Sequence, residues 1–443
     1  MGSLTDHAID FTLNSRWEKL PAEVQHQAKR CLLDTLGALI AGSQTPVAHI
    51  IRKTAREQFG GDQATILVSG ERVSAAGAAL ANGFFGNALD IDDGYRNIKG
   101  HPGACALPPV LAAAELAGGC SGQAFLTTLV VAYELGIRAG VIRHRTYDVY
   151  HSSGSWGAIA GAAAAGRLLG FNAQQILHAM GAAEYHAPIA PMMKGIDTPS
   201  MGKDSIGWGC MVAVLAARLA RDGFTGIGPL FDDAPDAALV YSLESDWEML
   251  NLYFKPYATC RWGQPAVAGA LKIIRENQLT PDRIQRIRVR TFEAATRLPN
   301  GHPRDTEEAQ YSLAFPVAAA LLDGAVGPAQ VLPPRLHDPE LLSLLDRVST
   351  EEAPEFEAEF PAKAPAEVVV ETTDGQIFHS GRIEALWEPP DTLPTDSELE
   401  SKFRWLVAPV LGLDRCRELV STLWHFEKQS DARILTRICQ KAR

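Results

Sequence analysis

The chain has 443 residues, of which 46% are hydrophobic and 21% are charged, with a formal net charge of −11 and a pI of about 5.6. This length and composition predict a folded protein of roughly two or three domains with a large core. The acidic balance argues against nucleic acid or an anionic membrane as the main partner, although a local basic pocket can still bind a small anion.

The start of the chain, MGSLTDHAIDF, carries acids and no long apolar run, so we expect no secretory signal. The alanine-rich segments are too short and too interrupted to span a bilayer. Seven scattered cysteines without a CxxC pattern indicate reduced thiols. We therefore expect a cytoplasmic protein, with an organelle matrix as the alternative.

The first ~260 residues predict one helix after another, because apolar residues recur at helical spacing. Small residues dominate these helices, which allows close packing of neighbouring helices in a compact bundle. The clearest segments are VQHQAKRCLLDTLGALIAG, LPPVLAAAELAGG, GQAFLTTLVVAYELGIRAGV, SWGAIAGAAAAGRLLGF and WGCMVAVLAARLARDGF.

The pattern changes near residue 280. RIQRIRVRTF alternates basic and apolar residues and predicts a strand, and AEVVVETTDGQIFHSGRI predicts a hairpin around Thr-Asp-Gly. After the proline-rich EPPDTLPTD, the segments LESKFRWLVAPVLG and CRELVSTLWHFEKQSDARILTRI are again helical. The prediction is a mainly α protein: a helical domain over 1–264 with 396–443, and an α+β domain over 265–395. A cleft between two domains is a favoured ligand site.

The stretch ALDIDDGYRNIKGHPG places Asp90, Asp92 and Asp93 within four positions and His101 shortly after them. Three interpretations remain open at this point. The acids form a solvated turn, they bind Mg²⁺, or they orient His101 and tune its pKa for acid–base catalysis. The chain has no GxxxxGK[ST] phosphate loop to accompany a magnesium site.

Four further residues lie near predicted helix starts or among aromatic residues: His151, Lys203, Lys255 and Arg261. Each has a structural alternative, namely a surface lysine, a salt bridge at the edge of the core or a buried histidine. Together with the acids they suggest a site for a small polyanionic acid. The cations would hold carboxylates and stabilise charge that develops beside a carboxylate, and a histidine would move the proton.

Four segments resemble the MmgE/PrpD family in order along the chain: ANGFFGNALDIDDGYRNIKGHPG, KDSIGWGCMVAVLAARLARDGFTG, YFKPYATCRWGQP and EEAQYSLAFPVAAALLDG. That family includes 2-methylcitrate dehydratase, cis-aconitate decarboxylase and iminodisuccinate epimerase. The resemblance implies a large helical domain with a smaller α+β lid domain, usually a homodimer, and no metal or organic cofactor.

Carried residue by residue, the resemblance makes Asp90, His101 and His151 active-site groups and Lys203 and Lys255 substrate-binding lysines. Arg261 is a weaker candidate for substrate binding, from its surroundings. The expected function is a hydro-lyase for a methylcitrate- or alkylcitrate-like tricarboxylate, with proton transfer next to a carboxylate. The alternatives are a cis-aconitate-type decarboxylase, an epimerase of a small dicarboxylate, or a non-catalytic protein that binds a small acid.

The chain also departs from the pattern of the decarboxylases. Gly94 stands where they have a threonine, one extra residue precedes His101, Cys260 replaces a histidine, and Phe315 replaces a tyrosine. A histidine common in the family is Gln264 here. These differences weaken the decarboxylase assignment and leave the substrate open.

Overall fold

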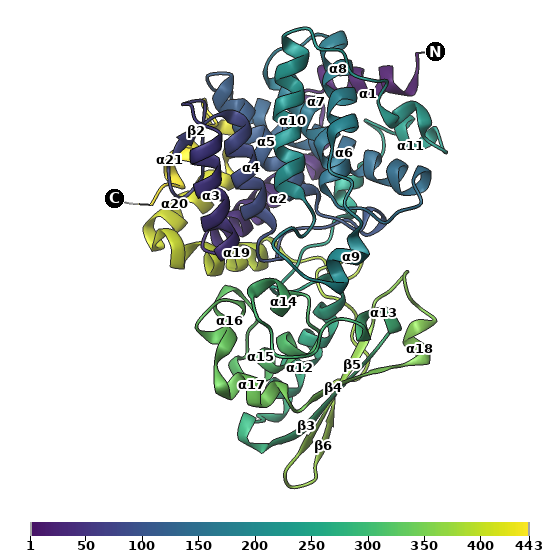
Figure 1. The fold of residues 1–443 in the computed structure, drawn as a ribbon, viewed down its shortest axis with the longest axis vertical. Coiled ribbons are helices and arrows are strands. Elements are labelled where there is room, and N and C mark those ends of the chain that lie inside the picture. The colour runs from purple at the N-terminus through teal and green to yellow at the C-terminus, as the bar shows by residue number, and fades with distance from the viewer. Residues whose placement is uncertain (1, 442–443) are drawn as a thin grey trace.

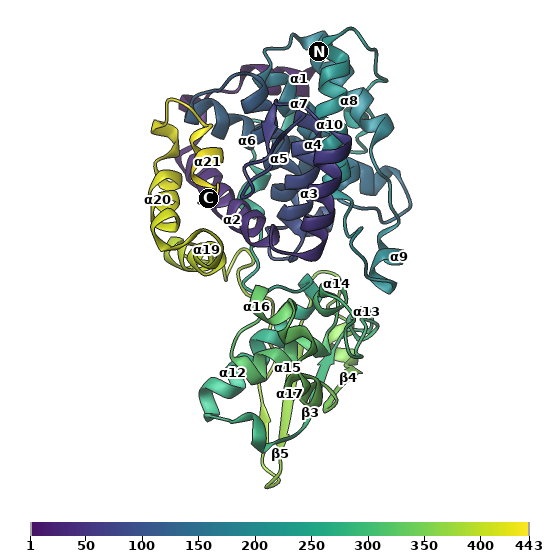
Figure 2. The same cartoon turned by 60° about the vertical axis from the view of Figure 1, so that its left-hand side comes forward.

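The computed structural model describes residues 2–441 and shows two bodies joined by a narrow waist (Figure 1). The larger body is helical and contains both ends of the chain, and the smaller body combines a sheet with short helices (Figure 2). The predicted mainly α fold with a smaller α+β part is therefore confirmed. The predicted boundaries lie beside the starts of α12 (Gln264–Asn277) and α19 (Asp396–Leu411) and stay a prediction about independent folding units.

The larger body is built from the N-terminal helices, a two-stranded antiparallel ribbon and three C-terminal helices. Its first elements are α1 (Leu4–Asn14), α2 (Ala22–Gly42), α3 (Pro46–Gln58), β1 (Ala64–Thr65), β2 (Arg72–Val73), α4 (Ala75–Asn87), α5 (Pro102–Leu116) and α6 (Gly122–Thr146). They are followed by α7 (Gly154–Leu168), α8 (Ala173–His186), α9 (Met192–Asp197), α10 (Ile206–Arg221) and α11 (Ala238–Tyr241).

Close helix packing in the centre depends on glycine and alanine. Nearly every residue of α4, α5 and α7 is buried, and α10 packs against α4, α7 and α8. A Cβ atom on Gly83 would lie 2.8 Å from the Cα atom of Gly207. The backbones of α4 and α10 therefore approach more closely than any larger side chain would allow.

The helix α6 is long and apolar enough to cross a membrane by length and composition, but its apolar window is completely buried inside the protein. It is the core helix of the larger body, in contact with α5 and α7. All seven cysteines lie within the described residues and are free thiols, as the sequence predicts.

The C-terminal helices close the larger body against α2 (Figure 2). Lys402 of α19 donates hydrogen bonds to Asp34 of α2 and to the carbonyl of Ile91, both at 2.6 Å, in a buried position. The last predicted helix is wrong as one continuous element. It divides into α20 (Leu413–Trp424) and α21 (Ile434–Ile438), because the backbone between them bonds to the α5–α6 loop.

The smaller body has a four-stranded sheet in the order β4-β3-β5-β6. Strands β3 (Ile284–Thr291) and β4 (Val348–Glu352) are parallel, and β5 (Ala366–Thr372) pairs antiparallel with β3 and with β6 (Ile377–His379). The predicted strand and hairpin are confirmed as β3 and β5–β6. The helices of this body are α12, α13 (Glu293–Thr296), α14 (Thr306–Gln310), α15 (Ala314–Asp323), α16 (Pro328–Val331), α17 (Pro339–Leu345) and α18 (Pro354–Glu357).

Candidate active site

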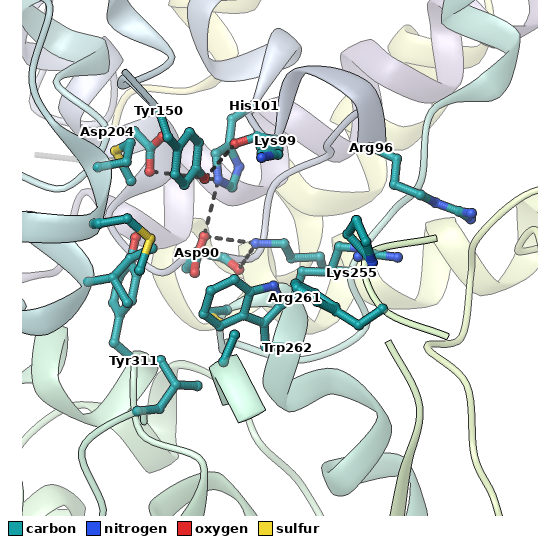
Figure 3. Close-up of a pocket in the computed structure, with 18 of the residues that line it drawn as sticks. Asp90, Arg96, Lys99, His101, Tyr150, Asp204, Lys255, Arg261, Trp262 and Tyr311 are labelled. Carbon is teal, nitrogen blue, oxygen red and sulfur yellow. Dashed lines mark hydrogen bonds and ion pairs between the residues drawn. The ribbon is translucent and has the colours of Figure 1, made fainter. Parts of the chain in front are cut away.

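A cavity of about 330 Å³ lies where the two bodies meet (Figure 3). The larger body contributes the loop after α4, the start of α5 and helix α9, and the smaller body contributes α13 and the segment after α18. The polar lining residues are Asp90, Arg96, Lys99, His101, Tyr150, Asp204, Tyr253, Lys255, Cys260, Arg261 and Tyr311.

Three predicted site residues meet in this cavity: Asp90, His101 and Lys255. The Lys255 ammonium is 2.8 Å from Oδ1 of Asp90, and Nε2 of His101 is 3.5 Å from the same oxygen. Burial acts to raise the pKa of the Asp90 carboxyl, but the charge of Lys255 and other nearby cations outweighs it and holds that pKa well below its usual range. Asp90 is therefore a permanent anion between two proton-bearing groups.

The backbone after α4 explains why Asp90 points into the cavity. Asp90 has φ of +52°, in the left-handed region, so the chain turns sharply just after the helix. The carbonyl of Ile91 then accepts a hydrogen bond from Lys402, and Gly94 pairs with Tyr253 in an isolated antiparallel bridge. These contacts from distant segments fix the acidic loop in place.

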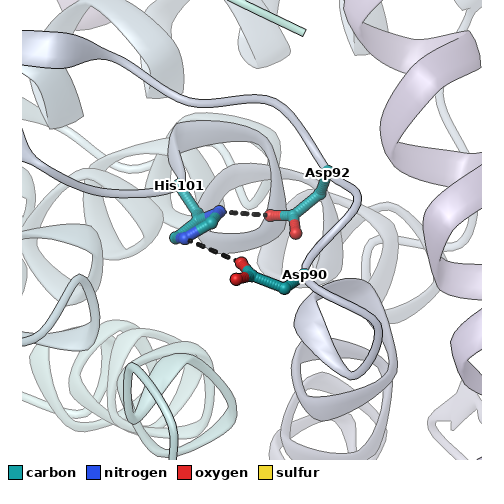
Figure 4. Close-up of side chains that lie close together, drawn as sticks. All are labelled: Asp90, Asp92 and His101. Carbon is teal, nitrogen blue, oxygen red and sulfur yellow. Dashed lines mark ion pairs between the residues drawn. The ribbon is translucent and has the colours of Figure 1, made fainter. Parts of the chain in front are cut away.

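The three aspartates have different surroundings, although they are neighbours in the sequence. Asp90 lines the cavity, whereas Asp92 lies behind His101, with its Oδ2 3.0 Å from the ring Nδ1 (Figure 4). Asp93 accepts hydrogen bonds from the Gly103 amide and the Tyr133 hydroxyl. Burial and the nearby charge of Asp34 raise the pKa of Asp93 to about 7, so this third acid has a structural role.

His101 precedes the first residue of α5 and is only 7% exposed. Burial acts to lower its pKa, but the Asp92 carboxylate outweighs burial, and the pKa is raised above the ordinary value of 6.5. Asp204 adds to this effect, with Oδ2 4.0 Å from Nε2. The His101 ring therefore keeps its proton to a higher pH than a free imidazole does.

Asp90, Asp92 and His101 offer ligand atoms within 4.8 Å of one another, a spacing that a metal ion could use. However, the Lys255 ammonium already contacts the Asp90 carboxylate at 2.8 Å. A divalent ion would have to share that oxygen with a second cation at close range, which is unfavourable. The arrangement fits a proton-transfer centre better than a metal centre.

Lys203 does not line this cavity. It lines a much smaller pocket, which shares Asp204 with the cavity. Its ammonium donates to the carbonyl of Asn87 at 2.6 Å and to Oε1 of Gln310 at 2.8 Å. It also contributes to the low pKa of Asp90. In this structure Lys203 influences the site through Asp90, and its predicted direct contact with substrate stays a prediction.

His151 also lies outside the residues that line the cavity. Its ring stacks on His144 at 4.3 Å between centroids, and its Nδ1 is 2.7 Å from the Ser155 hydroxyl. Burial and the neighbouring His144 lower the pKa of His151 to about 4, so the ring is neutral at pH 7. The predicted role as a second acid–base group finds no support in this position.

Arg261 lines the cavity, but its guanidinium is already paired. It donates to both carboxylate oxygens of Glu388, at 2.7 and 2.8 Å, and lies over the Tyr253 ring. Arg96 donates to the same carboxylate at 2.9 Å. Two guanidiniums on one carboxylate leave a net positive charge at this end of the cavity.

Sequence reasoning missed several lining residues, including Arg96, Lys99, Tyr150, Asp204 and Tyr311. Arg96 and Lys99 lie inside the acidic stretch, and Asp204 directly follows Lys203. These three residues could have been found as sequence neighbours of residues already predicted to be in the site. Tyr150 directly precedes His151 and donates to the Lys99 carbonyl at 3.1 Å. For Tyr311 the sequence offers no signal beyond its place within a family-like segment.

Profiles of known families match nearly the whole chain. Residues 7–250 match the MmgE/PrpD N-terminal domain, and residues 257–425 match the MmgE/PrpD C-terminal domain. The chain belongs to the MmgE/PrpD family. The predicted family is therefore confirmed.

Similar proteins are named for cis-aconitate decarboxylation. The chain is 26% identical to the cis-aconitate decarboxylase-like protein oryM of Aspergillus oryzae, over 97% of this chain and 96% of that protein. It is 25% identical to human cis-aconitate decarboxylase, over 94% of this chain and 90% of the relative. The enzyme from Aspergillus terreus is 22% identical over 97% and 94%. Such relatives support an enzyme here, with a lyase-type reaction on a citrate-like acid.

The positions that depart from the decarboxylase pattern divide into two groups. Cys260 lines the cavity, and burial raises the pKa of its thiol to about 11, which leaves it uncharged. Gly94 lies directly beneath the Tyr253 ring. Gln264 and Phe315 are buried and absent from the cavity lining. The Gln264 amide donates to the carbonyls of Tyr257 and Thr259, so it supports the segment that carries Cys260.

Proposed function

We propose that this MmgE/PrpD protein is a hydro-lyase that removes water from a methylcitrate- or alkylcitrate-like tricarboxylate. The observation that carries the proposal is the contact of His101 and Lys255 with one oxygen of Asp90 inside the cavity. A cationic imidazole, a buried ammonium and a fixed carboxylate provide what proton transfer beside a carboxylate requires.

The cationic lining supports a polyanionic substrate. Lys255, Lys99, Arg96 and Arg261 line the cavity and contribute positive charge, and Figure 3 shows them gathered on one side of His101. Lys255 is only 2% exposed, and a buried charge is worth more than a surface charge, both for binding carboxylates and for stabilising an enediolate-like transition state. Lys203 supports the same charge balance indirectly through Asp90.

Two neighbouring residues of the cavity lining, Asp204 and His101, divide the proton transfers in this proposal. Asp204 accepts the proton from the carbon next to a carboxylate, and the C–H electron pair becomes the new carbon–carbon double bond. His101 donates its proton to the departing hydroxyl, which leaves as water. Asp204 takes the place that the sequence assigned to His151, because it lines the cavity and lies 4.0 Å from His101.

Decarboxylation of a cis-aconitate-like acid is the second candidate, favoured by the names of the relatives over more than 90% of the chain. In that reaction the carbon–CO₂ bond breaks, its electron pair moves into the carbon skeleton, and His101 delivers the proton. It needs a single proton donor and no base. The two candidates therefore differ in their use of Asp204.

The deciding experiment incubates the purified protein with citrate, 2-methylcitrate and cis-aconitate and follows the products by mass spectrometry. Loss of water from a citrate-type acid, abolished in His101→Ala, supports the proposal. Loss of CO₂ from cis-aconitate, retained in Asp204→Asn, replaces it with the second candidate. Wild-type rates in a folded His101→Ala variant would remove His101 as proton carrier in both.

A further inference from the structure

The cavity lining combines two chemically different sets of residues. One set consists of the charged groups around Asp90 and His101, as described above. The other set is apolar, comes from both bodies of the protein and is called the apolar wall here. Its members are Met192, Met193, Ile196, Trp262, Ala294, Leu298, Phe360 and Pro361.

The apolar wall is partly buried, with Met193 and Pro361 at its exposed part. Leu298 is 2%, Met192 4% and Ile196 8% exposed, yet each contributes to the lining of the cavity. Met192 and Ile196 come from α9 of the larger body, whereas Leu298 follows α13 of the smaller one. The two elements are also linked by the Arg297–Asp197 ion pair at 3.7 Å.

Aromatic packing fixes the far end of the wall. The rings of Phe360 and Phe292 stack at 4.2 Å between centroids, and Trp262 meets both edge-on at 6.1 and 5.9 Å. Such contacts hold aromatic side chains in defined positions. The wall is thus preorganised, and it does not have to form around a ligand.

A bare tricarboxylate does not match this wall. Its carboxylates would lose hydration against Leu298 and Ile196 without gaining a hydrogen bond, which is costly. A hydrocarbon group in the same place gains transfer free energy with every methylene that leaves water. Ligand sites commonly combine a largely apolar lining with a few placed polar groups, as here.

We infer that the substrate carries a hydrocarbon chain longer than methyl, which lies against Leu298, Ile196 and Trp262 while its carboxylates face Lys255 and His101. This inference rests on the proposed function for the charged side of the cavity. It narrows the substrate class to alkyl- or alkenyl-substituted tricarboxylates. The cavity volume of about 330 Å³ limits the length of this chain.

The test is equilibrium binding of citrate-type acids that carry hydrogen, methyl, butyl or hexyl at the carbon next to a carboxylate. Isothermal titration calorimetry measures the dissociation constants directly. We expect affinity to rise about threefold to fourfold per methylene. Equal affinities across the series, or tightest binding of unsubstituted citrate, would overturn the inference.

Polar substitutions in the apolar wall test whether the hydrocarbon chain lies against it. Leu298→Gln and the more exposed Met193→Gln are expected to reduce the gain in affinity per methylene to less than twofold. Leu413→Gln, at a residue that is 70% exposed on α20, is the matched control and should keep the full gain. A full gain in both folded wall variants would contradict the placement of the chain.

The same series separates failure of the inference from failure of the proposed function. If alkyl acids bind tightly but no acid loses water, the apolar site stands and the hydro-lyase proposal fails. If citrate is dehydrated and longer chains reduce both binding and kcat/KM, the hydro-lyase stands and the hydrocarbon site fails. The titrations use the folded His101→Ala variant, which does not turn over in the proposed mechanism, so binding is measured apart from turnover and each result decides one of the two statements.

Discussion

Oδ2 of Asp92 lies 3.0 Å from Nδ1 of His101, while Nε2 of the same ring lies 3.5 Å from Oδ1 of Asp90 (Figure 4). Each ring nitrogen therefore has its own carboxylate, and of these two aspartates only Asp90 lines the cavity. Asp92 in turn accepts a hydrogen bond from Asn87 at 3.0 Å, which fixes its orientation. This pair determines the pH range in which His101 holds a proton.

The pH profile of activity tests this relationship. Since the proposed acid must be protonated, and Asp92 raises the His101 pKa above 6.5, kcat/KM should fall only as pH rises through that elevated value. Asp92→Asn removes the charge and should move the alkaline limb down by about one pH unit or more. Asp62→Asn, at a side chain that is 81% exposed, is the control. An unmoved limb in Asp92→Asn would exclude His101 as the titrating acid.

We expect activity to require glycine at position 94, because the Tyr253 ring lies against it. A Cβ atom at Gly94 would lie 2.2 Å from Cζ of the Tyr253 ring, so a threonine there must displace a cavity-lining side chain. We predict that Gly94→Thr lowers kcat/KM about 100-fold, since small misplacements at a site have effects of that size. Gly60→Thr, with open space around its Cβ position, should be nearly neutral. Unchanged kcat/KM in Gly94→Thr would show that the position of Tyr253 does not matter.

The buried ion pair between Lys402 and Asp34 should contribute to stability and to the position of the acidic loop. Lys402→Leu leaves Asp34 buried without its partner, and we expect the free energy of unfolding in urea to fall by about 3–5 kcal/mol. In the double variant with Asp34→Leu, most of this loss should be recovered, because a buried pair can be replaced by apolar groups. Lys363→Leu, at a half-exposed pair, should change stability by less than about 1 kcal/mol.

We also propose that the chain forms the expected homodimer through the outer face of α10. Trp208, Leu215 and Leu219 lie along one side of this helix and are 43%, 39% and 43% exposed. An apolar helix face of this kind is typical of an interaction surface. Light scattering should give twice the chain mass for the wild type and the single chain mass for Leu215→Glu, with Leu413→Glu unchanged. A monomeric wild type, or a dimeric Leu215→Glu, would contradict this interface.

Elements with a strong local pattern were predictable from the sequence. Examples are the apolar periodicity of α2, α6 and α10 and the alternation in β3. Both patterns follow from which faces of the element are buried, so they can be read from the order of apolar and polar residues. The break between α20 and α21 was not predictable. There the amide of Gly122 bonds to the carbonyl of Gln429 at 2.8 Å, a tertiary contact that replaces helical hydrogen bonds.

Candidate site residues were found through their chemistry and through the resemblance, but only some of them lie together in the structure. Asp90, His101 and Lys255 converge, although Lys255 is 165 residues from Asp90 in the chain. His151 has the same residue type and a similar helix-start context, but it stacks on His144 outside the cavity lining. Local sequence context does not show which way a side chain points once helices have packed.

The sequence by itself determined the family, the helical character of most of the chain and the presence of an acidic stretch with a histidine, because these depend on residue type and short-range order. Only the tertiary structure decided which aspartate faces the cavity, which cation is already paired and where the apolar wall lies. Those properties arise when segments far apart in the chain, such as α9 and α13, are brought to one cavity. Packing fixes distances and burial, and these in turn set the charge of each group.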